Sequence, residues 1–169
     1  MGILNDLLRK VQTVNDGLES GMMVRDVLEP HANLILQLQQ EQLFAGKRSD
    51  GEDIRPYYTE DLKPSGYFSS REAAENYVAW KGSLSYPYEA KRNPDAPNLY
   101  INGRFHNELT VSFGPDALAI HGTTSFSNEI VAKYGLDTFG LTVENWNYIF
   151  VDANAYNDLV NDIKRELYG

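Results

Sequence analysis

The sequence contains no cysteine, and this absence removes several classes of protein from consideration. A chain without thiols forms no disulfides, has no thiol nucleophile and cannot bind zinc through cysteine. Long apolar runs are also missing, so we expect no membrane-spanning helix. The start, MGILNDLLRK, lacks the basic-then-apolar order of a signal peptide, and Asp6 stands where a myristoylation motif needs Ser or Thr. These features favour a soluble, cytosolic protein.

Motifs of common active sites are missing as well. There is no GxxxxGK[ST] or GxGxxG nucleotide-binding motif, and no serine lies in a GxSxG elbow. The acidic stretch SDGED lacks the alternating oxygen ligands of a calcium loop and is typical of a turn. We therefore predict a protein that is not an enzyme and that uses no cofactor and no metal ion.

Histidines offer the one alternative to that prediction. His106 and Glu108 flank a predicted β-hairpin, and His121 ends its return strand, so two imidazoles and a carboxylate could lie together. The interpretation we favour makes His106 and His121 strand-edge residues that form hydrogen bonds. After a non-enzymatic protein, our second hypothesis is a metal-dependent hydrolase or nuclease. The third is a monomeric adaptor or inhibitor that binds a host protein.

The charge balance bears on these hypotheses. The formal net charge is -9, and an acidic surface repels phosphate, so tight binding of nucleic acid is not expected. A nuclease would need basic contacts to phosphate. The same repulsion would suit a protein that DNA must pass without specific binding.

Amphipathic patterns predict helices at both ends of the chain. Apolar residues recur at steps of three and four from Ile3 to Val14, which predicts a helix over 1–20 that stops near Gly17 or Gly21. A similar stripe predicts a C-terminal helix over 154–168. A third helix begins near Pro30, where proline fits the first turn, and ends at Gly46.

The rest of the chain mixes irregular stretches with short elements. Long loops are expected over 47–70 and 83–98, separated by a helix with capping-box spacing from Ser69 to Glu72. A short β segment, LYI at 99–101, precedes a hairpin of LTVSF and LAIHG joined by a GPDA turn. Further helices are expected over 125–135 and from an N-cap at Thr142.

These elements predict one α+β domain of 169 residues. Its core, 22–150, contains a small antiparallel sheet packed with the long helix of the N-terminal half. Additional helices stand at both ends, and either could dock on a neighbouring chain.

Tyrosines supply most of the candidate interface residues. There are 11 tyrosines, several of them in the two long loops, where an apolar ring with a polar tip suits protein interfaces. The alternative, which we weight equally, is that the rings pin the loops onto their own domain. Together with residues of the end helices, the interface candidates are Tyr57, Tyr58, Tyr67, Tyr86, Tyr88, Leu7, Val11, Leu159 and Ile163.

Four stretches in a fixed order resemble a known family. They are SDGEDIRPYYT, NLYINGRFHNELTV, LAIHG and IVAKYGLDTFGLTVENW, within roughly 23–150, and a helix ending LQLQQEQLF precedes them. A chain with the motifs in this order resembles the head–tail joining and tail-completion proteins of tailed bacteriophages. The resemblance is greatest to such proteins of Bacteroides-type and crAss-like phages. The N-terminal helix, the tyrosine-rich 52–97 region and the C-terminal helix depart from the family pattern.

The resemblance implies a structural protein of the virion neck. Copies of such a protein form a homo-oligomeric ring between the portal and the tail, beside other neck and tail proteins, and the genome moves through it. The expected location is the virion, with the host cytoplasm during assembly. Ring closure requires two different patches on each subunit.

Overall fold

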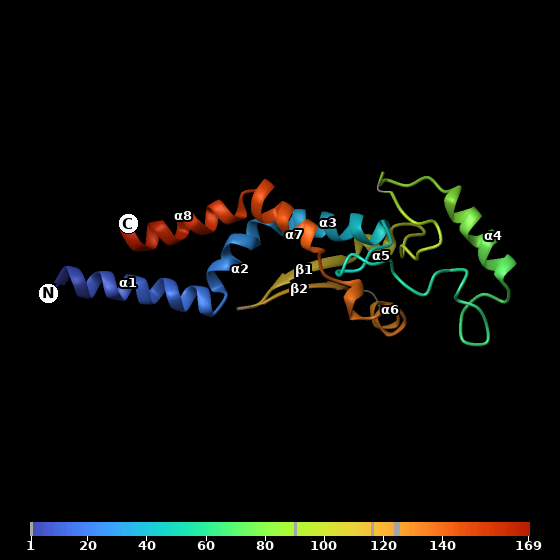
Figure 1. Cartoon of the computed structure of the whole chain (residues 1–169), viewed down its shortest axis with the longest axis horizontal. Helices are drawn as coiled ribbons and strands as arrows, with labels where there is room; N and C mark the ends of the chain where they lie inside the picture. The colour runs from blue at the N-terminus through green and yellow to red at the C-terminus, as the bar shows by residue number, and fades with distance from the viewer. Residues whose placement is uncertain (1, 90, 116, 124–125) are drawn as a thin grey trace. The chain divides into compact units, whose positions relative to one another are not determined.

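The structure is a computed structural model that describes residues 2–89, 91–115, 117–123 and 126–169. It contains helices and two strands in the order shown in Figure 1. In the N-terminal half these are α1 (Gly2–Glu19), α2 (Met22–Leu28), a 3₁₀ turn (Glu29–His31), α3 (Ala32–Phe44) and α4 (Arg71–Gly82). The C-terminal half has α5 (Arg104–Asn107), β1 (Leu109–Phe113), β2 (Leu118–Gly122), α6 (Ser127–Tyr134), a 3₁₀ turn (Leu136–Thr138), α7 (Val143–Asn147), a π-helical turn (Tyr148–Asp152) and α8 (Ala155–Tyr168).

The predicted α+β class is confirmed, with a two-stranded antiparallel sheet and helices at both ends of the chain. The long loops expected over 47–70 and 83–98 are irregular in the structure too. In the described ranges, no helix combines the length and the apolar character that a membrane crossing requires.

Contacts group the residues into two compact units, which we describe in turn. Unit 1 comprises Met1–Ile35, Val111–Ala119 and Glu144–Gly169, and unit 2 comprises Leu36–Thr110 and Ile120–Val143.

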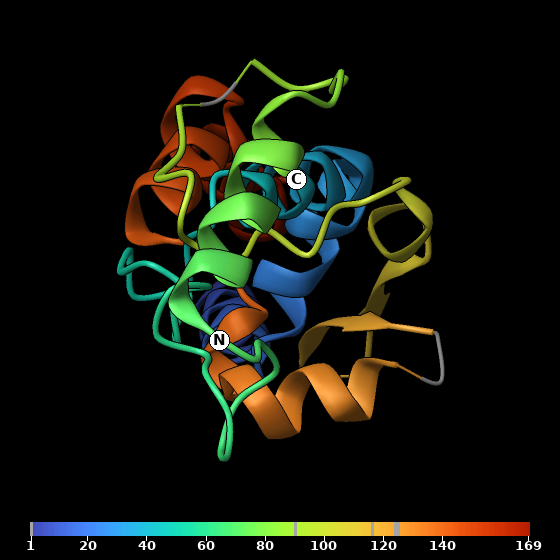
Figure 2. The same cartoon turned by 90° about the vertical axis from the view of Figure 1, so that its right-hand side faces the viewer.

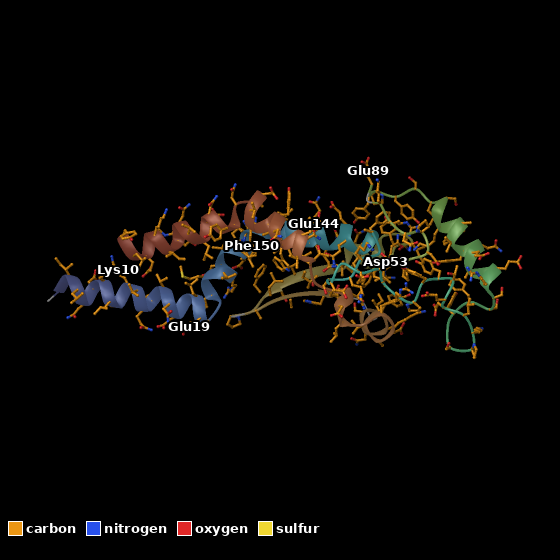
Figure 3. The ribbon with its side chains drawn as sticks, in the orientation of Figure 1. Lys10, Glu19, Asp53, Glu89, Glu144 and Phe150 are labelled. Carbon is orange, nitrogen blue, oxygen red and sulfur yellow. The ribbon has the colours of Figure 1, made fainter. Side chains whose placement is uncertain are left out.

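Unit 1 is built mainly from α1, α2 and α8. Helices α1 and α8 lie side by side and run in opposite directions (Figure 1), and Lys10 Nζ approaches the Leu167 carbonyl oxygen at 3.5 Å. Lys10 lies on the side of α1 that faces α8, whereas Glu19 points away from it (Figure 3). The buried apolar side chains of this unit include Val14, Val27, Leu28, Ile35 and Ile149.

Gly17 explains why α1 and α2 approach closely. We expected α1 to end near Gly17 or Gly21; it continues through Gly17 to Glu19, and Gly21 precedes α2. A Cβ on Gly17 would lie 2.7 Å from Met23 Cγ, so a larger residue would force the Met23 side chain to move. Gly17 therefore serves helix packing rather than helix termination.

Unit 2 has two hydrophobic clusters. In the first, Leu43 of α3, Ile54 and Leu109 of β1 are buried together, which is the predicted packing of the small sheet with the long helix. The second cluster joins Tyr58 and Phe68 to Ala74 of α4. Figure 2 shows α4 in green, with the irregular segments before and after it in teal and yellow-green.

Gly46 turns the chain from α3 into the first loop. Its φ of 73° is the left-handed conformation that favours glycine at the end of a helix, and a Cβ there would lie 3.0 Å from the Ala96 side chain. The carbonyl of Gly46 then accepts a hydrogen bond from the Ile54 N–H at 2.7 Å, and Lys47 pairs with Asp53 as an isolated β-bridge. The turn at 46–54 thus places Ile54 in the core.

Glutamines of α3, of which Gln39 and Gln42 are buried, bind the backbone of distant segments. Gln42 Nε2 donates to the Gly140 carbonyl at 2.8 Å, and Gln42 Oε1 accepts from the Thr142 N–H at 2.9 Å. Gln39 Oε1 accepts from the Gly140 N–H at 2.7 Å. Gln40 Nε2 donates to the His106 carbonyl at 2.8 Å. These bonds satisfy peptide groups that have no strand partner.

The segment LYI at 99–101 is not a strand, so that prediction was wrong. Leu99 has a φ of 55°, which no strand residue adopts, and Asn98 Oδ1 accepts a hydrogen bond from the Tyr100 N–H. Asn102 Oδ1 binds the Arg104 N–H and Gly103 has a φ of 80°, so the Asn-Gly pair opens helix α5 instead of a hairpin.

Two further details differ from the prediction or fall outside the described residues. Ser70 rather than Ser69 caps α4, since its side chain accepts from the Ala73 N–H at 3.2 Å. Asp116 of the GPDA turn and Ser125 of the helix expected over 125–135 lie outside the described residues; the described part of that helix is α6.

The glutamine bonds give a stability prediction. Gln42→Leu removes the amide and leaves the Gly140 carbonyl and the Thr142 N–H without that partner, which costs roughly 1–3 kcal/mol for each buried group left unpaired. Chemical denaturation should show the loss as a lower free energy of unfolding. The matched control is Gln37→Leu on the same helix, where an exposed amide donates to Glu41 and a change within about 0.5 kcal/mol is expected. Equal effects of both substitutions would contradict the structural role of Gln42.

Candidate functional site

The apolar stripe of α1 is largely exposed to solvent in unit 1. Val14 is its one buried residue, while Ile3 is 90% exposed, Leu4 63% and Leu8 58%. The interface candidates Leu7 and Val11 are 45% and 49% exposed. Scattered exposed leucines are ordinary on protein surfaces, but a contiguous row along one helix marks an interaction surface.

Helix geometry explains why Leu4, Leu8 and Val11 stay uncovered. At about 100° per residue, Leu4 and Leu8 lie roughly 80° and 120° round the helix from Val14. Glu19, which points away from α8 (Figure 3), lies only about 20° from Leu8. The packing of α1 on α8 therefore buries one edge of the stripe and leaves the other edge, with Leu4, Leu8 and Val11, in solvent. We call this edge the α1 apolar edge.

The candidates on α8 have a different environment. Leu159 and Ile163 are half-buried, on a helix that contacts both α1 and α2. The structure thus places Leu7, Val11, Leu159 and Ile163 in one unit, and the two on α1 are the more exposed pair.

Most of the candidate tyrosines pack within unit 2. The ring of Tyr58 is buried against Phe68 and Tyr77, at centroid distances of 6.2 and 5.0 Å. The hydroxyl of Tyr57 donates to Asp53 Oδ2 at 2.8 Å, and the Arg55 guanidinium lies 3.9 Å from its ring centroid. Both residues hold the 47–70 loop to its own unit.

Tyr86 and Tyr88 hold the second loop in the same way. Their rings lie 4.9 and 5.0 Å from the ring of Phe44 at the end of α3. Tyr67 differs from the other four, because it is 73% exposed. Loop pinning accounts for four of the tyrosines, and a role for any of them in an interface stays a prediction.

The histidines have separate partners rather than a shared site. His106 is fully buried in α5, not at a strand edge as we predicted, and its Nε2 lies 2.9 Å from the Asn98 carbonyl oxygen. His121 is exposed on β2, with its Nε2 3.1 Å from Thr110 Oγ1. Within the described ranges, no three His, Cys, Asp or Glu side chains are placed to hold a metal ion.

A buried lysine lies at the centre of a polar cluster in unit 2. Lys81 of α4 is 1% exposed; its Nζ donates to the Tyr58 hydroxyl at 2.9 Å and also to Asn98 Oδ1. The ring centroids of Tyr58 and Tyr77 lie 5.3 and 6.0 Å from Nζ. The cluster therefore joins α4 to both long loops, and through the Asn98 carbonyl to His106 of α5.

Burial controls the charge state of this cluster. It lowers the pKa of Lys81 to about 7, with a smaller contribution from the positive charge of Arg92. Burial also lowers the pKa of His106 and raises the pKa of Tyr58. Each shift favours the neutral form, because a low dielectric penalises charge.

Sequence reasoning missed Lys81, although a signal was present. Ala74, Tyr77 and Val78 form the apolar side of α4, and Lys81 follows Tyr77 and Val78 at helical spacing of four and three residues. A lysine on the apolar face of a helix is a candidate for burial.

Comparison with known proteins does not assign this chain to a family. No protein-family model, no curated protein and no solved structure matches it.

The shifted pKa of Lys81 predicts how stability depends on pH. From about pH 8 to about pH 9.5 the lysine is largely neutral in the folded chain and protonated in the unfolded chain, so the unfolded state binds more protons. The free energy of unfolding should therefore rise with pH across this window, with a contribution from Lys81 of up to about 1.4 kcal/mol per pH unit. Urea denaturation at several pH values measures the slope.

A matched pair of variants isolates the contribution of Lys81. Lys81→Met should flatten the slope, whereas Lys91→Met, at an exposed position, should retain it. A slope that is unchanged in Lys81→Met would show that another group controls this pH dependence.

Proposed function

We propose that this protein is a structural subunit of the neck of a tailed bacteriophage, where copies form a ring between portal and tail. The observation that carries the proposal is the α1 apolar edge: Leu4, Leu8 and Val11 are about half exposed or more, although α1 already packs on α8. Burying a leucine side chain stabilises a complex by about 1.5–3 kcal/mol, so a row of them is a costly surface to leave in water.

The proposal gives the two faces of unit 1 separate roles. One face of α1 binds α8 within the subunit, and the α1 apolar edge binds the neighbouring subunit. A ring requires that this edge meets a different patch on the neighbour, because a heterologous contact closes by rotation. Tyr67 in unit 2 is a second candidate for contact with a neighbouring subunit, because its ring and hydroxyl are exposed.

The acidic charge fits a ring through which DNA moves. With a net charge of -9, the subunits repel phosphate, so the genome would pass without specific binding. The ordered stretches that resemble the head–tail joining family also support the proposal, and they suggest portal and other neck or tail proteins as partners. The proposed location is the virion, after assembly in the host cytoplasm.

Self-association of the full chain tests the proposal. Sedimentation velocity and native mass spectrometry should detect a closed oligomer of fixed copy number. Its stability should increase with salt, because salt screens the repulsion between acidic subunits while the apolar contact remains. Leu4→Glu combined with Leu8→Glu should leave the protein monomeric at concentrations where the wild type assembles.

The control for that variant adds the same charge beside the α1 apolar edge. Asn5→Glu combined with Gln12→Glu changes two exposed polar positions of the same helix and should still assemble. Circular dichroism should show unchanged helix content for both double variants. A wild type that stays monomeric at all concentrations and salts, or assembly that survives both charges on the edge, would contradict the proposed contact.

DNA binding gives an independent prediction. The wild-type protein should not retard duplex DNA in a mobility-shift assay at about 150 mM salt, because its net charge opposes phosphate contacts. A tight complex with DNA would contradict the proposed passive passage.

A further inference from the structure

Unit 2 contains a cavity of about 280 Å³ that has a lysine in an otherwise aromatic and apolar wall. The wall comes from the 47–70 loop, α4, the 97–105 segment and the 126–134 segment that contains α6, and four tyrosines contribute to it. The wall residues that matter here are Lys81, Tyr58, Tyr77, Tyr100, Tyr134 and Ile101. A cavity of this size accepts a molecule smaller than a typical drug.

The amine of Lys81 is held in a defined position in this wall. Its Nζ has two acceptors, the Tyr58 hydroxyl and Asn98 Oδ1, and Asn98 is itself fully buried. A neutral amine donates two hydrogen bonds and keeps one lone pair. Among the residues that the structure describes, no carboxylate forms an ion pair with Lys81, and the partners of Nζ are uncharged: the two acceptors and the rings of Tyr58 and Tyr77.

An uncharged amine whose lone pair is free can act as a nucleophile. Both N–H bonds are occupied by fixed acceptors, which leaves the lone pair as the free valence of Nζ. Burial lowers the pKa of Lys81 to about 7, so a large fraction of the amine is neutral near pH 7, whereas an ordinary lysine is almost entirely protonated there. Desolvation of a lysine in an apolar pocket is one of the established ways to activate it toward carbonyl compounds.

We propose that this cavity binds a small aldehyde or ketone with an apolar substituent, and that Lys81 forms an imine with it. The Nζ lone pair attacks the carbonyl carbon and forms the N–C bond while the carbonyl oxygen takes up a proton. Loss of water then breaks the C–O bond and gives C=N. The two hydrogens of that water are equal in number to the two that the amine nitrogen gives up. The aromatic wall contacts the apolar substituent, and the imine nitrogen, once it takes up a proton from solvent, donates its single N–H to Tyr58 or Asn98.

The proposal is independent of the neck assignment, because the cavity lies in unit 2 and the α1 apolar edge lies in unit 1. A chain that fails to form rings could still form an imine at Lys81. A chain that forms no imine could still assemble into rings.

Reductive trapping on the full chain tests the site. The protein is incubated near pH 7 with benzaldehyde and sodium cyanoborohydride, which reduces the imine to a stable benzylamine, and the modified lysines are mapped by peptide mass spectrometry. We expect Lys81 to react roughly tenfold faster or more than the exposed Lys63 and Lys91, since more of its amine is neutral. Modification of Lys63 and Lys91 without modification of Lys81 would overturn the proposal.

Two controls keep the test decisive. Lys81→Met should abolish the fast reaction and leave Lys91 labelling unchanged, whereas Lys91→Met should keep the fast reaction. Should Lys81→Met fail to fold, competition in the wild type replaces it: cyclohexanone without reductant, added first, should slow benzylation of Lys81 and not of Lys91. Equal rates at Lys81 and Lys91 without competition, or protection by benzoate but not by cyclohexanone, would overturn the carbonyl site.

Discussion

The fold of unit 2 depends on side-chain amides that take the place of a larger sheet. Two strands cannot pair the backbone of the long irregular segments, and every buried peptide group still needs a partner. The glutamines of α3 supply those partners: Gln42 and Gln39 bind the chain at Gly140 and Thr142, and Gln40 binds α5. The same helix also gives Leu43 to the apolar core, so α3 organises unit 2 through both polar and apolar contacts.

Repeated patterns in the sequence predicted most helices and the hairpin. The prediction was wrong where local side-chain hydrogen bonds set the backbone conformation. The helices at both ends, helix α3 before Gly46 and the hairpin follow from apolar periodicity and glycine positions. The segment 99–101 looked like a strand because it is apolar, but side-chain bonds of Asn98 and Asn102 and the left-handed Leu99 override that preference. Such bonds depend on local geometry that composition does not encode.

The candidate sites show the same limit. The apolar stripe of α1 was visible in the sequence, yet which edge of it stays exposed depends on how α8 packs, and only the structure gives that. The sequence could not show that Tyr58 packs on Phe68, or that Tyr86 and Tyr88 pack on Phe44, because these contacts join segments far apart in the chain; an interface role for the tyrosines stays a prediction. Lys81 was missed because lysine is normally a surface residue.

Protection of α1 on assembly tests the central claim most directly. Because the chain has no cysteine, Leu8→Cys and, as a control, Leu136→Cys each introduce a single thiol at an exposed position. The proposed neck role predicts that the thiol at position 8 reacts with a maleimide more slowly as the protein concentration rises and subunits cover the α1 apolar edge, while the thiol at position 136 keeps its rate. Rates at position 8 that do not change with concentration, in a sample that forms oligomers, would contradict the claim that this edge joins the subunits.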